Sequence, residues 1–398
     1  MDECTVRSTV FGRTLGQVAD VELARWEWHV AQGGDPAAML KSFLCSFGLP
    51  AHDLSTFLPA DNEPHAPGVT GSSHNAQAQL FFSAAGCAAL AGLPVGATSP
   101  APHIPDIAAV IYPLTAVKVT MRHEQTEPLT IGPWHASWTH KEHSAAIESV
   151  KQAIRRGSVY QANVVGHRFA QYTGDPLTAL SAIATLPSAT YGDLMVGETW
   201  ALATATPELL LHISNGIITT RPIKGTRPAT AAGKTELLAS AKERAEHIMI
   251  VDLMRNDVAL LAQTGTVRVT ELFGIRRWSD LWQAESVIQG ALKPATGITE
   301  IARALFPGGS VTGAPKRAAV ELLAQLEPVG RGPAMGAIGW MTPTETTLGL
   351  TIRTVAASQG RLHVWAGGGI TIDSDPVAEV AEADAKAAPL LKVLAGDY

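Results

Sequence analysis

The segment LLLHISNGIITT, residues 209–220, fixes more of the fold than any other stretch of its length. Two β-prone runs flank Asn215 and Gly216. Asn-Gly between such runs is the strongest short-range hairpin signal, because both central residues of a type I′ turn need a positive φ. With this loop Ser214 faces Ile217, and pairing continues outward from them. The segment therefore predicts an antiparallel hairpin of defined register.

The same register, extended outward, brings an acid and an amine together. Glu208 and Lys224 are sixteen residues apart, yet they fall within one cross-strand step, about 5–8 Å between Cβ atoms. Regular alternation would point them to opposite faces, but Pro207 and Pro222 cannot donate ladder hydrogen bonds, so the alternation is expected to break there. The segment predicts a carboxylate–amine pair. An exposed basic loop remains the alternative.

Two helices are predicted to carry paired glutamates. Residues 234–264 lack Gly and Pro and end at Gly265, while a C-terminal helix begins at Pro376 with Asp375 as its N-cap. Glutamates three residues apart share a helix face, and the two pairs are Glu243 with Glu246 and Glu379 with Glu382. Such carboxylates suit Mg²⁺, which prefers oxygen ligands. Two solvated helix faces are the open alternative.

A glycine-rich loop and several shorter elements complete the pattern. Residues 308–316 have the Gly-x-x-x-x-Gly spacing of a phosphate loop, but Ala314-Pro315 replaces the Lys-Ser/Thr that would contact phosphate. The loop is either an anion-binding turn or a plain tight turn. Strands are predicted at 108–111, 116–119, 337–340, 348–355 and 362–365, the last entering Gly367 to Gly369, and a helix at 143–156. Residues 1–135 otherwise look irregular.

Composition limits the class of protein. The chain has 398 residues, 46% hydrophobic and 17% charged, with a net charge of -6. This describes a globular protein without the basic field that nucleic acid or an anionic membrane needs. The longest small-apolar run, 84–93, is about half the roughly 20 residues that span a bilayer. Three scattered cysteines, Cys4, Cys45 and Cys87, favour a reducing cytoplasm.

A series of ordered blocks resembles the chorismate-utilising enzymes, and within that family the aminodeoxychorismate synthases (component I). The resemblance runs from about residue 158 to the end of the chain, close to 60% of its length, and its blocks lie at 158–163, 206–208, 221–228, 243–257, 308–316, 336–339, 351–354 and 365–370. Lys224 sets the assignment within the family, because anthranilate and isochorismate synthases usually carry Ala there. The resemblance implies an α+β fold with two large antiparallel sheets packed face to face and helices outside.

The resemblance also implies site residues. Lys224 would attack C2 of chorismate while Glu208 acts as general acid and base, and ammonia would then add at C4 and expel the lysine. Mg²⁺ would bind Glu243, Glu246, Glu379 and Glu382. Substrate contacts would come from Gly225, Thr226, Ser310, Arg353, Gly367 and Lys386. Two positions depart from the family pattern: Gln283 stands for a His and Ala334 for a Tyr.

The expected activity is therefore amination of chorismate to 4-amino-4-deoxychorismate, a step toward p-aminobenzoate and folate. Residues 1–135 would form a divergent region packed into the same unit, and 136–398 the catalytic core. Ammonia would come from a separate glutamine amidotransferase, because no Cys/His nucleophile pair is evident in this sequence. The alternatives are an anthranilate synthase component I, another chorismate-transforming enzyme, or a non-catalytic paralogue that binds a partner.

Overall fold

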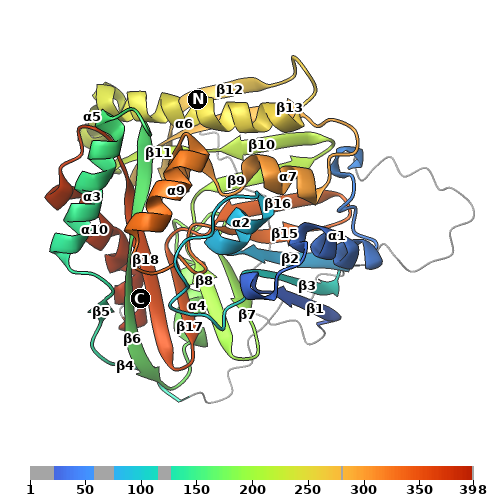
Figure 1. The fold of residues 1–398 in the computed structure, drawn as a ribbon, viewed down its shortest axis with the longest axis horizontal. Coiled ribbons are helices and arrows are strands. Elements are labelled where there is room, and N and C mark those ends of the chain that lie inside the picture. Colours follow the sequence, from blue (N-terminus) through green and yellow to red (C-terminus); the bar gives the residue numbers. More distant parts are fainter. Residues whose placement is uncertain (1–21, 58–75, 115–126, 279–280, 397–398) are drawn as a thin grey trace, which may run out of the picture.

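A computed structural model describes residues 22–57, 76–114, 127–278 and 281–396, and it contains two antiparallel sheets (Figure 1). The ten-stranded sheet has the order β1 (Ala24–Trp28), β3 (Ile107–Pro113), β2 (Ala76–Phe82), β15 (Ala337–Met341), β16 (Glu345–Leu350), β9 (Leu209–Ser214), β10 (Ile217–Arg221), β13 (Leu281–Ala291) and β11 (Ile223–Pro228), with β12 (Arg268–Trp278) also paired to β13. The eight-stranded sheet has the order β14 (Gly313–Ala314), β6 (Gln161–Thr173), β18 (Arg361–Ile370), β17 (Thr354–Ser358), β8 (Trp200–Thr204) and β7 (Asp193–Val196), with β4 (Thr130–Ile131) and β5 (His135–Ala136) paired to β6. The largest apolar cluster draws buried side chains from both sheets. The expected α+β class is confirmed.

The hairpin forms as predicted. Asn215 and Gly216 both have positive φ, 53° and 70°, and Ser214 pairs with Ile217 at the start of the β9–β10 ladder. A bulge between Thr219 and Arg221 shifts the register slightly before Pro222, where the break was expected. Strand β10 then pairs with β13, and β11 continues along β13 after the proline. The bulge and the change of partner therefore set how β11 is placed.

The helices lie against the sheets (Figure 1). The expected helix over 234–264 is two helices, α5 (Ala231–Ala239) and α6 (Ala241–Leu261), because Ser240 caps the second by accepting from the Glu243 N–H. Helix α10 (Pro376–Leu394) begins as predicted, with Asp375 as its N-cap. Helix α3 (His140–Arg155) ends just before Gly157. Helices α3 and α10 pack together, with α10 on β18, and α6 packs on β13 and β11.

The N-terminal part is more regular than its sequence suggests. Strand β2 pairs with β15 and with β3, so β1, β3 and β2 extend the ten-stranded sheet. Every residue of β2 is buried, which removes the alternation that reveals a half-exposed strand. Gln79 is tolerated there because its amide donates to Asp193. The irregular expectation was wrong for this segment, while the boundary at 135/136 stays a prediction.

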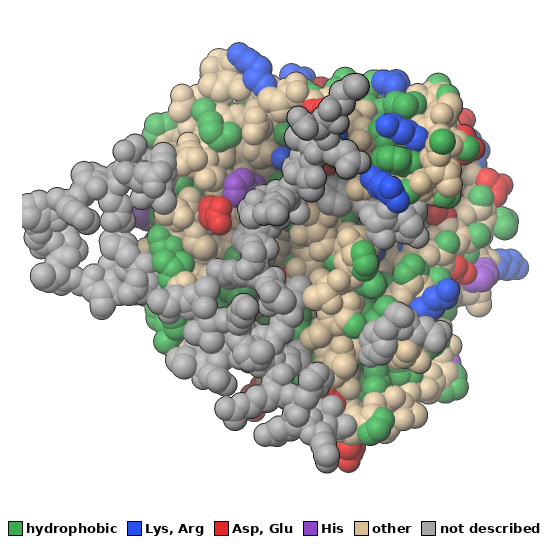
Figure 2. All heavy atoms as spheres, turned by 180° about the vertical axis from the view of Figure 1, so that it is seen from behind, with side chains coloured by type: hydrophobic (Ala, Val, Ile, Leu, Met, Phe, Trp, Pro, Cys, Tyr) green, Lys and Arg blue, Asp and Glu red, His purple; other side chains and the backbone are tan. Residues whose placement is uncertain are grey.

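The remaining elements connect these layers. They are η1 (Val30–Gln32), α1 (Pro36–Ser46), η2 (Leu54–Thr56), α2 (Ala84–Leu90), α4 (Leu177–Ala184), α7 (Ile298–Leu305), α8 (Gly309–Thr312) and α9 (Lys316–Leu326). The expected strand at 116–119 and Cys4 lie outside the described residues. None of the helices in the described ranges is long and apolar enough to cross a membrane. On the face shown in Figure 2, basic and acidic side chains lie among apolar and uncharged ones.

Candidate functional site

Glu208 and Lys224 meet between the sheets. The loop before β9 places Glu208, which is only 6% exposed, beside the start of β11. Its carboxylate accepts hydrogen bonds from the Ser310 hydroxyl and the Ile223 N–H, and the Lys224 amine lies close enough to attract it. The β9–β10 ladder ends at Arg221 and Leu209, so Glu208 reaches the start of β11 with its side chain. The structure brings the predicted acid, amine and Ser310 together.

Burial pushes the acid and the amine toward their neutral forms. It raises the pKa of Glu208, although the Ser310 hydrogen bond and the Lys224 charge oppose the shift. It lowers the pKa of Lys224, with the Glu208 charge as the main opposing influence. A neutral amine is a nucleophile and a protonated carboxyl is a general acid. The pair is therefore suited to displacing a hydroxyl group.

The glycine run of β18 lets polar side chains approach the backbone from both faces. A Cβ at Gly369 would lie 3.3 Å from Lys224 Nζ, and one at Gly368 would lie 3.2 Å from Glu379 Oε2 and 3.5 Å from Lys386 Nζ. Lys386 Nζ also donates to the Gly367 carbonyl at 3.0 Å. Adjacent strand residues face opposite ways, so α10 reaches one face of β18 and Lys224 the other. Larger side chains here would close the site.

Arg353 reaches the site from a strained turn. The predicted strand over 348–355 is split between β16 and β17, and Arg353 lies in the break with a φ of 54°. Its guanidinium is near enough to Glu208 to feel that charge, which partly offsets the lowering of the Arg353 pKa by burial, and it donates to Ser188 Oγ at 3.3 Å. Left-handed backbone is costly for a residue with a Cβ. An arginine held in this way is a candidate anion contact.

Gly225 and Thr226 lie on β11 beside the first glutamate pair. Gly225 has a φ of 75° at a bulge, and a Cβ there would approach Glu243 Oε2 at 3.0 Å. Thr226 is exposed and pairs with Gln283 of β13. The bulge shifts the register between Lys224 and Thr226, so their side chains do not follow the regular alternation of a strand. Of the predicted substrate contacts, Thr226 is the one the structure leaves outermost on β11.

The four predicted metal carboxylates occupy α6 and α10 but are not gathered into a cage. Each has a local partner: Arg227 to Glu243 at 3.2 Å, Lys242 to Glu246 at 3.9 Å, Ser374 to Glu379 at 2.6 Å and Lys386 to Glu382 at 2.8 Å. Across the described ranges, no three His, Cys, Asp or Glu side chains are close enough to hold a metal. Burial and the charges of Glu243 and Glu379 raise the pKa of Glu246, despite the opposing charges of Lys242 and Lys224. The donor set fits a hard cation, which would relieve that repulsion.

The two departures from the family pattern are both buried. Gln283 is 3% exposed, and its Oε1 has no hydrogen-bond partner among the described residues. Ala334 is fully buried next to the positive-φ residue Met335. Neither side chain carries a group that titrates. Neither position can therefore supply or accept a proton at this site.

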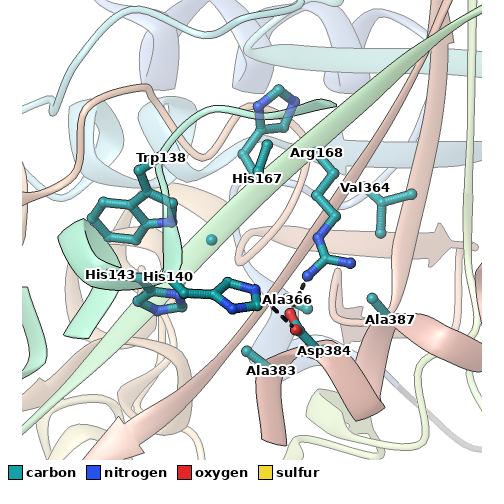
Figure 3. Close-up of a pocket in the computed structure, with 12 residues that line it drawn as sticks. Trp138, His140, His143, His167, Arg168, Val364, Ala366, Ala383, Asp384 and Ala387 are labelled. Carbon is teal, nitrogen blue, oxygen red and sulfur yellow. Dashed lines mark hydrogen bonds and ion pairs between the residues drawn. The ribbon is translucent and has the colours of Figure 1, made fainter. Parts of the chain in front are cut away.

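A pocket lies on the face of β6 that carries Gly166 and Arg168, between α3 and α10 (Figure 3). Its charged groups neutralise one another, since Asp384 pairs with Arg168 and lies 3.2 Å from His140 Nε2. His143 stacks on Trp138 with ring centroids 4.5 Å apart. The pocket contains none of the residues predicted for the site. Its charged groups have partners already, which is typical of a structural cluster.

Two features of the fold were missed from the sequence. Cys45 Sγ lies 3.9 Å from His52 Nδ1 at the end of α1, a proximity that the sequence did not predict. The contact is long and His52 is exposed. Gln161 and Asn163 line the site from β6, although only the motif around them was noted. Their position depends on pairing with β18, about two hundred residues later, which no local signal reveals.

These features together define a two-sheet α+β enzyme fold with a lysine–carboxylate site beside a glycine-rich strand. The family model described as chorismate binding enzyme matches residues 97–392, and the chain belongs to that family. It is 37% identical over 256 residues to aminodeoxychorismate synthase component 1 of Salmonella typhimurium, covering 63% of this chain and 56% of that protein. It is 36% identical over 266 residues to anthranilate synthase component 1 of Acinetobacter calcoaceticus, covering 63% and 53%.

The fold has solved counterparts. Anthranilate synthase component I from Streptococcus pneumoniae TIGR4 aligns over 93% of this chain and 90% of that one, with a TM-score of 0.74 and 22% identity. The sequence matches to both kinds of synthase have similar identity, and the chain spans little more than half the length of those curated relatives. The comparisons establish the family and the fold. They do not distinguish between the products of the two kinds of synthase, so a proposed product must rest on the residues of the site.

Proposed function

We propose that this protein aminates chorismate at C4, giving 4-amino-4-deoxychorismate through a covalent intermediate on Lys224. The observation that carries the proposal is the Lys224–Glu208 pair, whose burial favours a neutral amine and a protonated carboxyl. Membership of the chorismate binding family supports the substrate, and similarity to an aminodeoxychorismate synthase component 1 supports the product. The Lys224 amine favours a covalent route, because direct addition of ammonia to chorismate would not need it.

The reaction divides into two displacements. In the first, Lys224 Nζ forms a bond to C2, the ring double bonds shift, and the C4 hydroxyl leaves as water with the proton of Glu208. In the second, ammonia forms a bond to C4, the double bonds return, and the lysine amine leaves C2. The new ammonium group then returns one proton to Glu208. Each step is easier than one direct displacement, and both residues are regenerated.

The remaining residues bind and orient the substrate in this proposal. Glu243, Glu246, Glu379 and Glu382 would hold Mg²⁺, which would supply positive charge for a substrate carboxylate. Arg353 and Lys386 would contact the anionic groups of chorismate, and Gly225, Thr226, Ser310 and Gly367 would line its ring. Ammonia would come from a separate glutamine amidotransferase subunit in the cytoplasm, and the product would feed p-aminobenzoate and folate synthesis.

Product analysis tests the proposal. Purified protein is incubated with chorismate, ammonium and Mg²⁺, and the products are separated by chromatography and identified by mass and ultraviolet spectrum. We expect aminodeoxychorismate, with no release of pyruvate. Anthranilate with an equal amount of pyruvate would identify an anthranilate synthase instead. Unchanged chorismate under all conditions would favour a paralogue that only binds.

Intact-protein mass spectrometry tests the covalent step separately. Without ammonia, the second displacement cannot occur, so wild-type protein with chorismate should carry an adduct equal to chorismate minus water. Lys224→Ala should carry none. Lys392→Ala, which removes an exposed lysine from the last turn of α10, is the matched control and should be labelled like wild type. An adduct on Lys224→Ala would contradict the assigned nucleophile.

A further inference from the structure

Gln161 and Asn163 lie on one side of the eight-stranded sheet, and Lys224 approaches the sheet from that side at Gly369. They alternate on β6 and so share one face, and Asn163 pairs with Gly369 of β18. A Cβ at Gly369 would lie 1.9 Å from Gln161 Nε2 and 3.3 Å from Lys224 Nζ. We call this side of β6 and β18 the interior face. Because Gly369 has no side chain, the Gln161 amide and the Lys224 amine are close neighbours there.

Both amides on the interior face keep an oxygen without a partner. Gln161 is 1% exposed and Asn163 is 6% exposed, and neither Gln161 Oε1 nor Asn163 Oδ1 accepts a hydrogen bond from any described residue. The orientation of Asn163 is set by its Nδ2, which donates to the Val311 carbonyl at 3.1 Å. Buried polar atoms are almost always satisfied. Two free acceptors on one face, one of them on the residue beside Lys224, therefore point to a ligand that donates hydrogen bonds.

We infer that Gln161 and Asn163 form a subsite for ammonia, an inference that rests on the proposed amination. The substrate's carboxylates are acceptors themselves and gain nothing from an amide oxygen. Ammonia donates N–H groups to such oxygens while its lone pair stays free to attack carbon. Carboxylates in these positions would favour ammonium, which is not a nucleophile, whereas neutral amides favour the cation far less. Lys224 bonded at C2 would keep ring position C4 close by.

Steady-state kinetics provide the test. Gln161→Met and Asn163→Leu remove one acceptor each with little change in volume, and Gln171→Met changes the same residue type at an exposed position on the same strand. Rates are measured against ammonium at saturating chorismate, fixed pH and constant ionic strength. Losing one hydrogen bond should raise the KM for ammonia about tenfold in each of the first two variants. The KM for chorismate should stay within about twofold, and the control should match wild type.

Two results would overturn the subsite. An unchanged KM for ammonia in both folded variants would mean that the amides hold only water. A raised KM for chorismate with an unchanged KM for ammonia would assign them to the substrate. If Gln161→Met fails to fold, Asn163→Leu still decides the test.

A binding measurement separates this inference from the proposed function. Thermal unfolding is compared in ammonium chloride and sodium chloride of equal concentration, which needs no turnover. Wild type should gain roughly 1 °C or more in ammonium, and Gln161→Met should not. If wild type forms no product yet shows this difference, the proposed function fails and the subsite stands. If neither the KM nor the melting temperature responds to ammonia, the subsite is wrong whatever the product.

Discussion

The two faces of strands β6 and β18 differ in how their polar groups are partnered. On the interior face, Gln161 and Asn163 keep free oxygens, and Lys224 approaches Gly369. On the opposite face, Arg168 and Asp384 neutralise each other (Figure 3). Both faces are built from the same strands and both carry charged or amide groups. The difference is that the charges of Arg168 and Asp384 are satisfied within the chain, whereas the oxygens of Gln161 and Asn163 are not.

This comparison shows why chemistry is assigned to one face. A satisfied cluster has already used its hydrogen bonds and charges, so a ligand must break contacts before it makes any. Unsatisfied buried groups have already lost their hydrogen bonds to water, so every hydrogen bond from a ligand adds to the binding free energy. Burial also raises the pKa of Glu208 and lowers the pKa of Lys224, so the same side of the sheet holds an acid and an amine that are pushed toward their neutral forms. The predictions below test this contrast.

The largest effect is expected at the nucleophile. Lys224→Ala should lower amination on the order of a thousandfold or more, because the covalent route is lost. Chorismate binding should change little, since Arg353 and the carboxylate helices remain. Product formation and the chorismate Kd are measured on the same preparation. Normal amination by this variant would remove the covalent mechanism.

The sequence predicted the local part of this site and not the long-range part. Glu208 and Lys224 were foreseen because one Asn-Gly turn fixes the register of residues sixteen apart. Gln161 could not be foreseen, because its neighbour Lys224 belongs to the other sheet and their meeting depends on Gly369. Ser240 shows a smaller limit: its cap splits a helix that apolar periodicity alone reads as continuous.

The general acid should give the next largest effect. Glu208→Gln keeps the shape but cannot deliver a proton, so the rate should fall about 10²- to 10⁴-fold. Covalent labelling by chorismate should slow in parallel, because hydroxide is a poor leaving group. Glu148→Gln, at a partly exposed position of α3, is the control. If only the KM for chorismate rises, Glu208 would be a binding residue.

Metal dependence tests whether the carboxylates of α6 and α10 act together. A Mg²⁺ concentration of about a hundred times its Kd should raise the free energy of unfolding by about 2.7 kcal/mol. It should also lower the Kd for chorismate. Glu243→Gln combined with Glu379→Gln should abolish both responses, since one ligand is lost from each helix. Metal titration by calorimetry and thermal unfolding measures this. Identical responses in wild type and the double variant would leave the glutamates as ordinary helix-face charges.

Acid stability should reveal a buried histidine pair that lies further along β6 and β18, away from Gln161 and Asn163. His167 lies between Ser137 Oγ at 2.6 Å and His363 Nδ1 at 3.1 Å, and burial lowers the pKa of His167 to about 3 and of His363 to about 4. Since both folded-state values lie below the unfolded value, stability falls as pH drops below about 6.5, by about 1.4 kcal/mol per pH unit for each histidine, down to about pH 4. Urea unfolding between pH 7 and 5 measures the slope. His167→Gln should make it shallower, and an equal slope would contradict this origin.

The smallest effect should come from the satisfied face. Asp384→Asn removes the charge that holds Arg168 and His140, but these groups are partly exposed, so the loss of stability should be about 0.5–1 kcal/mol. Amination and the KM for ammonia should equal wild type, because the pair lies across β6 from Gln161. Urea unfolding and the ammonia titration are run together on Asp384→Asn and on Gln161→Met. If Asp384→Asn changes the KM for ammonia as much as Gln161→Met does, the two faces are not independent, and the contrast between them cannot locate the chemistry.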